Sequence, residues 1–145
     1  MEFDDVVLGR RSIRGFKDEP VPRDLLLEVI GLATRAPSSM NTQPWYFHAV
    51  AGDALDRIRE GNTERNLAGV PASREIRMHG PYDGVHRERQ KAIAVQLFDA
   101  MDIAWSDKER RKDWVLRGFR QFDAPVSIVV CFDKSLDNND IAIFD

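Results

Sequence analysis

The sequence predicts one domain of the mixed α and β class. Apolar residues recur at helical spacing in several segments, whereas only 45–50 and 126–132 have the aromatic and β-branched composition of strands. A length of 145 residues suits a single domain, here taken as 1–145, and is enough to bury a core. Helices that alternate with so few strands indicate a mixed α and β fold.

The helices can be placed by their apolar spacing and their end signals. Gly9 ends the first helix, Pro22 suits the first turn of the second, and Pro37 ends that second helix. The predicted helices are 3–8, 22–35, a segment that opens at Gly52-Asp53, a segment with its first turns at 87–91 and its apolar face reaching Met101, and about 108–119.

The rest of the chain is read from composition. From Gly61 to about Val85 the sequence is polar and rich in glycine and proline, which predicts a long irregular segment such as a lid or binding loop. Residues 126–132 are almost all apolar, as in a strand covered on both faces. Residues 138–140 predict a turn, with Asp140 placed to cap a following helix.

Composition excludes several classes of partner. The net charge of −3 gives no reason to expect a general nucleic-acid or anionic-membrane binder. The N-terminus is acidic and lacks the apolar region of a secretory signal, and no apolar run approaches membrane-spanning length. Cys131 is the only cysteine, so no internal disulfide forms. We expect a cytoplasmic protein with an inert, packed Cys131.

Metal and dinucleotide motifs are missing from the sequence. His48, His79 and His86 lack the spacing of metal ligands, and no Walker or Rossmann glycine fingerprint is present. We therefore expect no metal site. A nicotinamide would bind transiently and not in a domain of its own.

A row of cationic side chains stands out near the N-terminus, at 10–16 (Arg-Arg-Ser-Ile-Arg-Gly-Phe). If this segment is extended, Arg10, Ser12 and Arg14 lie on one edge, and Arg11 and Ile13 on the other. Two guanidinium forks and a hydroxyl in a row suit an elongated anion with a phosphate at one end. A solvated basic turn is the alternative interpretation.

A second motif, at 36–45, reads Ala-Pro-Ser-Ser-Met-Asn-Thr-Gln-Pro-Trp and follows an amphipathic helix. Together with the segment 10–16 it resembles the nitroreductase family of FMN-dependent oxidoreductases. That family has Arg-(basic or His)-Ser-x-(Arg/Lys)-x-Phe near the N-terminus, then a helix, then Pro-Ser-x-x-Asn-x-Gln-Pro-Trp. Both halves occur here in that order and at that spacing.

The resemblance implies a fold and an activity. The fold would be α+β and nitroreductase-like, with a central mixed sheet wrapped by helices and two interlocked subunits that hold FMN at their interface. The activity would be transfer of hydride from NAD(P)H through flavin N5 to a nitroaromatic or quinone, both substrates using one pocket in a ping-pong scheme. No catalytic acid or base is named, because the cofactor makes and breaks the bonds.

The resemblance also implies site residues. Arg10 and Ser12 would contact the phosphate and ribityl chain, and Arg14 would lie near the N1–O2 edge, where its charge stabilises the reduced, anionic flavin. Arg11 points to the other edge and would use its backbone. From the partner subunit, the loop 37–43 would reach the flavin. The implied cofactor contacts are Arg10, Arg11, Ser12, Arg14, Pro37, Ser38, Ser39, Asn41 and Gln43.

Several of these residues fit more than one interpretation. The second motif also fits a helix stop built from Asx and Ser turns, and Gln43 fits either a flavin contact or a loop-shaping role. Residues 86–89 fit an entry point for an anionic substrate such as a nitrobenzoate, or a solvated helix face. Either stacking on a substrate or packing in the core fits four aromatic residues, Trp105, Trp114, Phe119 and Phe122.

Other functions are also open. The same family includes reductive dehalogenases and flavin-cleaving enzymes, and the arginine row would also serve a non-enzymatic anion-binding module. The sequence closes on an apolar run at 141–145, just after a polar turn. Family members continue for some tens of residues with a glycine-containing loop near flavin N5 and basic residues on the phosphate. We therefore expect a C-terminally truncated chain, and one that folds poorly is a further alternative.

Overall fold

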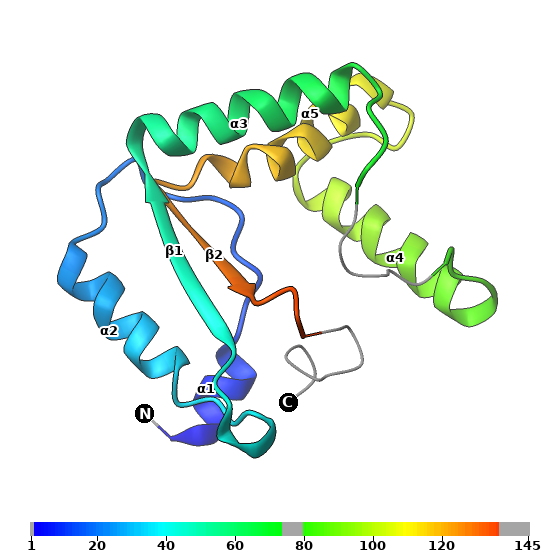
Figure 1. The fold of residues 1–145 in the computed structure, drawn as a ribbon. Coiled ribbons are helices and arrows are strands. Elements are labelled where there is room, and N and C mark those ends of the chain that lie inside the picture. The colour runs from blue at the N-terminus through cyan, green and yellow to red at the C-terminus, as the bar shows by residue number, and fades with distance from the viewer. Residues whose placement is uncertain (1, 74–79, 137–145) are drawn as a thin grey trace.

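The computed structural model describes residues 2–73 and 80–136 (Figure 1). The two strands lie at its centre, with α3 and α5 across one end and α4 extending away from the body (Figure 1). The helices and strands are α1 (Phe3–Gly9), α2 (Arg23–Ala33), β1 (Trp45–Ala51), α3 (Gly52–Leu67), α4 (Gly84–Ala100), α5 (Lys108–Phe119) and β2 (Val126–Phe132). Short 3₁₀ segments cover Ser39–Asn41 and Gln121–Asp123. The mixed α and β class is confirmed.

The sheet of the described residues consists of β1 and β2, paired antiparallel from Trp45↔Phe132 to Ala51↔Val126. The mixed pairing expected of the family sheet is therefore not seen in this part of the chain.

Just after β2, the Ser135 backbone N–H donates to Asp133 Oδ1 at 2.8 Å. This bond, with a second one from the Ser135 hydroxyl, lowers the pKa of the exposed Asp133 carboxyl.

Helices α1, α2 and α5 and both strands agree with the predicted segments to within about two residues at each end. The prediction was wrong for 61–67, because α3 continues to Leu67. Gly61 opens the polar, glycine-rich stretch that predicted an irregular segment, yet Asn62 Nδ2 donates to the Phe119 carbonyl at 3.3 Å and α3 packs against α5. Glycine is about 1 kcal/mol less favourable than alanine inside a helix, and tertiary packing outweighs that cost here.

Helix α4 also begins earlier than predicted, at Gly84. Its C-terminal end is anchored, since Phe98 and the following Ile103 are buried. The predicted apolar face does not continue toward the N-terminal end, where Ile93 is 62% exposed. The helix is therefore held to the body mainly through Phe98 and its neighbours.

The prediction that β2 is covered on both faces is wrong for the described chain. Val129 and Val130 are exposed, Val130 by 59%. The apolar run correctly indicated a strand, but nothing in the described residues covers these two side chains.

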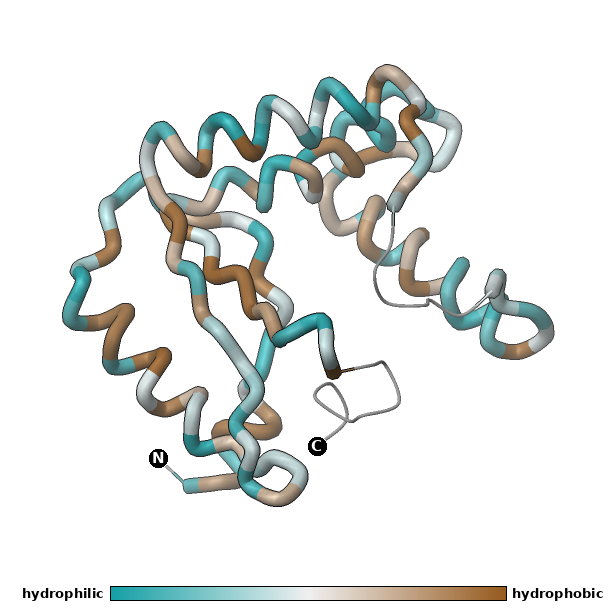
Figure 2. Tube along the Cα trace, in the orientation of Figure 1, coloured by the Kyte–Doolittle hydropathy of each residue, from teal (hydrophilic) through white to brown (hydrophobic). Residues whose placement is uncertain are grey.

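Much apolar surface remains open to solvent. The buried apolar core of the described residues consists of Leu55, Phe98, Ile103 and Ala124. The chain exposes 12167 Å², whereas a folded monomer of this size exposes roughly 7,600 Å². Hydrophobic residues follow α1, α2 and β2 (Figure 2), and the exposed ones include Phe3, Val6, Val7, Leu8, Leu25, Leu27, Val29 and Leu32.

Within 2–73 and 80–136, no helix combines the length and the apolar character needed to cross a bilayer. The predicted turn at 138–140 and the capping role of Asp140 fall outside the described residues, as do 74–79 of the segment predicted to be irregular.

Candidate functional site

The arginine segment 10–16 runs without regular secondary structure from the end of α1 and is exposed along its length. Arg10 has extended backbone angles, with φ −57° and ψ 133°. Its Nη1 donates to Ser12 Oγ at 3.3 Å. These two side chains therefore lie on the same edge of the segment, as the alternation of an extended chain predicted.

Arg11 serves a different purpose. Its Nη1 donates to the carbonyls of Leu8 and Arg10, each at 3.0 Å. Both carbonyls belong to the C-terminal end of α1, where unpaired carbonyls favour a cation. The Arg11 guanidinium thus caps α1 and points away from the Arg10–Ser12 edge.

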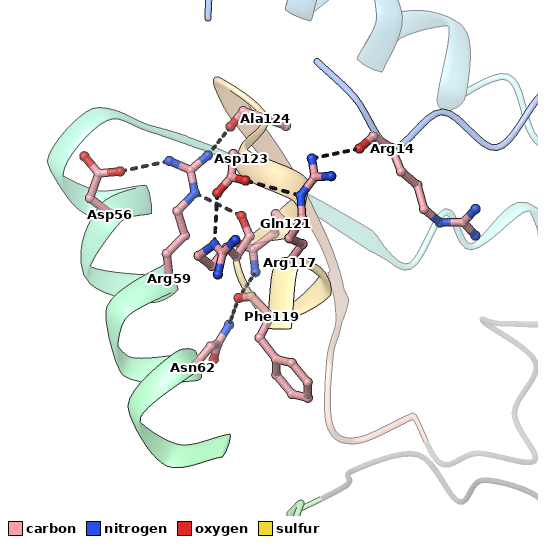
Figure 3. Close-up of polar contacts among 10 residues, drawn as sticks. Arg14, Asp56, Arg59, Asn62, Arg117, Phe119, Gln121, Asp123 and Ala124 are labelled. Carbon is pink, nitrogen blue, oxygen red and sulfur yellow. Dashed lines mark hydrogen bonds and ion pairs between the residues drawn. The ribbon is translucent and has the colours of Figure 1, made fainter. Parts of the chain in front are cut away.

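Arg14 is held by a distant part of the chain. Its carbonyl accepts a hydrogen bond from Arg117 Nη2 of α5 at 3.3 Å (Figure 3). Its guanidinium carbon lies 5.7 Å from the centre of the Phe122 ring, within the range of a cation–π contact. No spacing in the sequence indicated these partners, which lie more than 100 residues away.

The loop 37–43, which follows α2, is folded tightly on itself. The Gln43 backbone N–H donates to Ser38 Oγ at 2.9 Å, and the Asn41 N–H donates to the Ser38 carbonyl at 2.9 Å. Met40, Asn41 and Gln43 have positive φ angles of 53°, 56° and 45°. Such angles are uncommon outside glycine and tend to mark functional loops.

Within this loop the polar side chains divide into two groups. The Ser38 hydroxyl holds the loop together, while the Ser39 hydroxyl and the Asn41 amide form no hydrogen bond with any described residue. Ser39 and Asn41 are therefore available to a ligand. No hydrogen bond, ion pair or ring contact joins this loop to the arginine segment in the part of the chain described.

A polar network holds the turn that follows α5 (Figure 3). Arg59 of α3 donates through Nε to the Arg120 carbonyl at 3.1 Å and through Nη2 to the Ala124 carbonyl. Its Nη1 also pairs with Asp56 at 2.9 Å. No pattern in the sequence indicated this role, because Arg59 looks like one of several charges on an amphipathic helix.

The aromatic candidates pack mostly against one another. Phe98 lies 6.1 Å from Trp105 and 5.8 Å from Trp114, and Trp114 lies 6.0 Å from Phe122, measured between ring centres. The Arg111 guanidinium lies 4.4 Å from the Trp105 centre. This geometry favours packing over substrate stacking for Trp114 and Phe122, which are half-buried. Trp105 and Phe119 are exposed, by 49% and 37%.

The remaining candidates have ordinary surroundings. Residues 86–89 lie on the exposed N-terminal half of α4, where Arg87 Nη1 donates to Gln90. This is the solvated helix face. Cys131 is half-buried and unpaired. No cluster of metal-ligating residues occurs among the residues described.

The model of the nitroreductase family matches residues 7–142. The chain belongs to the nitroreductase family. It is 36% identical over 141 residues to a nitrobenzene nitroreductase of Ectopseudomonas oleovorans and 34% identical over 142 residues to a chloronitrobenzene nitroreductase of Comamonas testosteroni, in each case over 93% of this chain and 60% of the relative.

The solved structures confirm the nitroreductase-like fold. An FMN and NADPH-dependent nitroreductase, NfnB from Sphigopyxis sp. strain HMH, superimposes with a TM-score of 0.85 at 26% identity. The match covers 95% of this chain and 63% of NfnB. The chain thus spans about three fifths of the length of these family members. Both motifs, at 10–16 and 36–45, lie within the residues that the family model matches.

Proposed function

We propose that the complete protein is an FMN-dependent NAD(P)H nitroreductase that works as a cytoplasmic homodimer on small nitroaromatic or quinone acceptors. The observation that carries this proposal is the exposed Arg10–Ser12 edge within a chain of the nitroreductase family. Two relatives are named for reduction of nitrobenzene and chloronitrobenzene, and they support this acceptor class.

The described residues fit FMN. Arg10, Ser12 and Arg14 offer charged and hydroxyl donors in one short segment, which suits a phosphate at the end of a polyol. The Ser39 hydroxyl and the Asn41 amide lack hydrogen-bond partners in the described chain and would contact the flavin. The remaining predicted contacts, Pro37, Ser38 and Gln43, shape the loop that presents Ser39 and Asn41. Arg11 contributes through the end of α1 that it caps.

The residues of the chain would bind, orient and stabilise charge. When bound, FMN would supply the redox chemistry, taking hydride from NAD(P)H at N5 and giving it to the acceptor at the same pocket in turn. Arg14 would lie at the N1–O2 edge, where its fixed charge favours the reduced cofactor over the oxidised one. Arg10 and Ser12 would fix the phosphate and the ribityl chain.

The open apolar surface supports a homodimer. The chain exposes 12167 Å², roughly 4,600 Å² more than a monomer of its size. Obligate dimers bury about 2,000–5,000 Å² in total, or about 1,000–2,500 Å² on each subunit, so this excess is more than large enough for such an interface. A second subunit seated on α1, α2 and β2 would cover side chains such as Leu32 and Val130, and it would bring the loop 37–43 of one subunit to the flavin held by the other.

The test uses the purified full-length protein. We expect a bound yellow chromophore, and oxidation of NADPH that accelerates when nitrobenzene is added without oxygen. Product analysis with nitroarenes, halophenols and oxygen would separate nitroreduction from the dehalogenating or flavin-cleaving chemistry of other family members. A colourless protein that does not bind added FMN would contradict the proposal and favour an anion-binding module.

A further inference from the structure

We propose that Phe122 is a positioning residue for Arg14, and that the unusual turn after α5 exists to present its ring. This inference rests on the proposed function, since it concerns how Arg14 is aimed at the cofactor. The turn consists of Gln121, Phe122 and Asp123, with φ angles of 50°, 53° and 57°. Three consecutive left-handed residues without a glycine are sterically costly and persist only when their surroundings hold them.

The surroundings hold this turn from both ends. Arg59 donates to the carbonyl before the turn, at Arg120, and to the carbonyl after it, at Ala124. Asp123, inside the turn, pairs with Arg120 at 3.1 Å and with Arg117 at 3.7 Å. Figure 3 shows these groups converging on the turn from α3 and α5. The chain therefore fixes a conformation that a glycine would adopt without strain.

The side chain that this conformation presents is the Phe122 ring. The ring contacts both Trp114, with ring centres 6.0 Å apart, and the Arg14 guanidinium, whose carbon lies 5.7 Å from the ring centre. Arg117, which binds Asp123 of the turn, also donates to the Arg14 carbonyl at 3.3 Å. Both the backbone and the side chain of Arg14 are thus held by α5 and the turn after it.

The three arginines of the segment differ in this respect. Among the residues described, the Arg10 side chain bonds to Ser12 and the Arg11 side chain to the end of α1, both within a few residues. Arg14 alone of the three is tied to the distant α5 region. A cation–π contact restrains a guanidinium without using its N–H donors. Arg14 therefore stays in place while its donors remain free for the anionic edge of a ligand.

The experiment is a double-mutant cycle of Phe122→Leu and Arg14→Gln in the full-length protein. We expect Phe122→Leu to weaken FMN binding by about two- to fivefold, the equivalent of an exposed cation–π contact, and to lower the flavin midpoint potential. Phe122→Tyr keeps the aromatic face and should retain both values. In the Arg14→Gln background, Phe122→Leu should have almost no further effect, because the group that the ring restrains is gone.

Equal losses from Phe122→Leu in the two backgrounds would overturn the inference, since the ring would then act on the fold and not on Arg14. So would unchanged FMN affinity and midpoint potential in a folded Phe122→Leu protein. If that variant does not fold, Phe122→Met replaces it in the same cycle, because methionine also lacks the aromatic face and adapts more easily to the space that the ring occupied. A wild-type protein that binds no FMN would instead overturn the proposed function, and the inference with it.

Discussion

Arg59 gives the sharpest test of how the fold supports the candidate site. Its side chain is 19% exposed and makes polar contacts with three groups: the carbonyls of Arg120 and Ala124, and the carboxylate of Asp56. Arg59→Met keeps the aliphatic length of the side chain and removes all of these contacts. The carbonyls on either side of the left-handed turn would then lose their donors.

The magnitude follows from the contacts. A hydrogen bond from a charged group contributes about 1.5–3 kcal/mol, and an ion pair with an exposed carboxylate such as Asp56 contributes about 0–1 kcal/mol. The lower values apply because Arg59 keeps some solvent access, which gives a loss of about 3 kcal/mol in the free energy of unfolding. For a chain of this size, that corresponds to a fall in Tm of roughly 6–12 °C.

The assay is urea or thermal unfolding of the FMN-free protein at one fixed protomer concentration, because subunit association shifts apparent stability. Arg57→Met is the matched control. Arg57 lies on the same helix, is exposed, and forms no hydrogen bond or ion pair with the described residues. Its replacement should change stability by no more than about 0.5 kcal/mol. If Arg59→Met were as mild as Arg57→Met, the role assigned to Arg59 in holding the turn would be wrong.

The other predictions concern the cofactor and the interface. Arg14→Ala should lower the two-electron midpoint potential of bound flavin by roughly 40 mV. A charge at about 4 Å from another contributes about 4 kcal/mol near a protein surface, and solvent exposure halves that energy to about 2 kcal/mol. An unchanged potential in spectroelectrochemical titration would contradict this prediction. Arg10→Gln should weaken FMN binding about tenfold in a fluorescence titration and Arg11→Gln less than about twofold, because Arg11 caps α1; equal losses would refute that distinction. Ser38→Ala should lower the free energy of unfolding by about 1 kcal/mol in a thermal melt, because the loop loses the hydrogen bond to the Ser38 hydroxyl. No loss would show that the loop keeps its conformation without that bond. The Leu32 side chain is 67% exposed in the single chain. If a second subunit covers it, Leu32→Ser should weaken dimerisation at least about tenfold in sedimentation velocity. An unchanged dimer would place the interface elsewhere.

Local patterns predicted the elements well because their information is local. Helix α5 has the predicted bounds and β1 extends one residue beyond them, since apolar spacing and β-branched composition are properties of a few consecutive residues. The length of α3 was missed, because the helix continues past Gly61 through packing against α5, which includes the bond from Asn62 to the Phe119 carbonyl. Exposure of Val130 was missed for a related reason. An apolar strand shows that cover is needed and does not identify what provides it.

The candidate site divides in the same way. Alternation along an extended chain predicted that Arg10 and Ser12 share an edge, and their hydrogen bond shows it. The same alternation separated Arg11 from that edge but did not reveal that it caps α1. The partners of Arg14 lie in α5 and the turn after it, and no spacing rule links segments so far apart. The left-handed turn at 121–123 contains no glycine, so its sequence did not indicate the positive φ angles.

The arginine row and the open apolar surface depend on each other if the proposed function holds. An ion pair at 4 Å contributes about 1 kcal/mol in bulk water and about 4 kcal/mol near a protein surface of lower dielectric constant. The segment 10–14 is exposed in the single chain, so its affinity for an anion would be low there. A second subunit over the apolar side chains would exclude water and raise that affinity. By linkage, the anion would stabilise the dimer by the same free energy, so that cofactor affinity and subunit association rise and fall together.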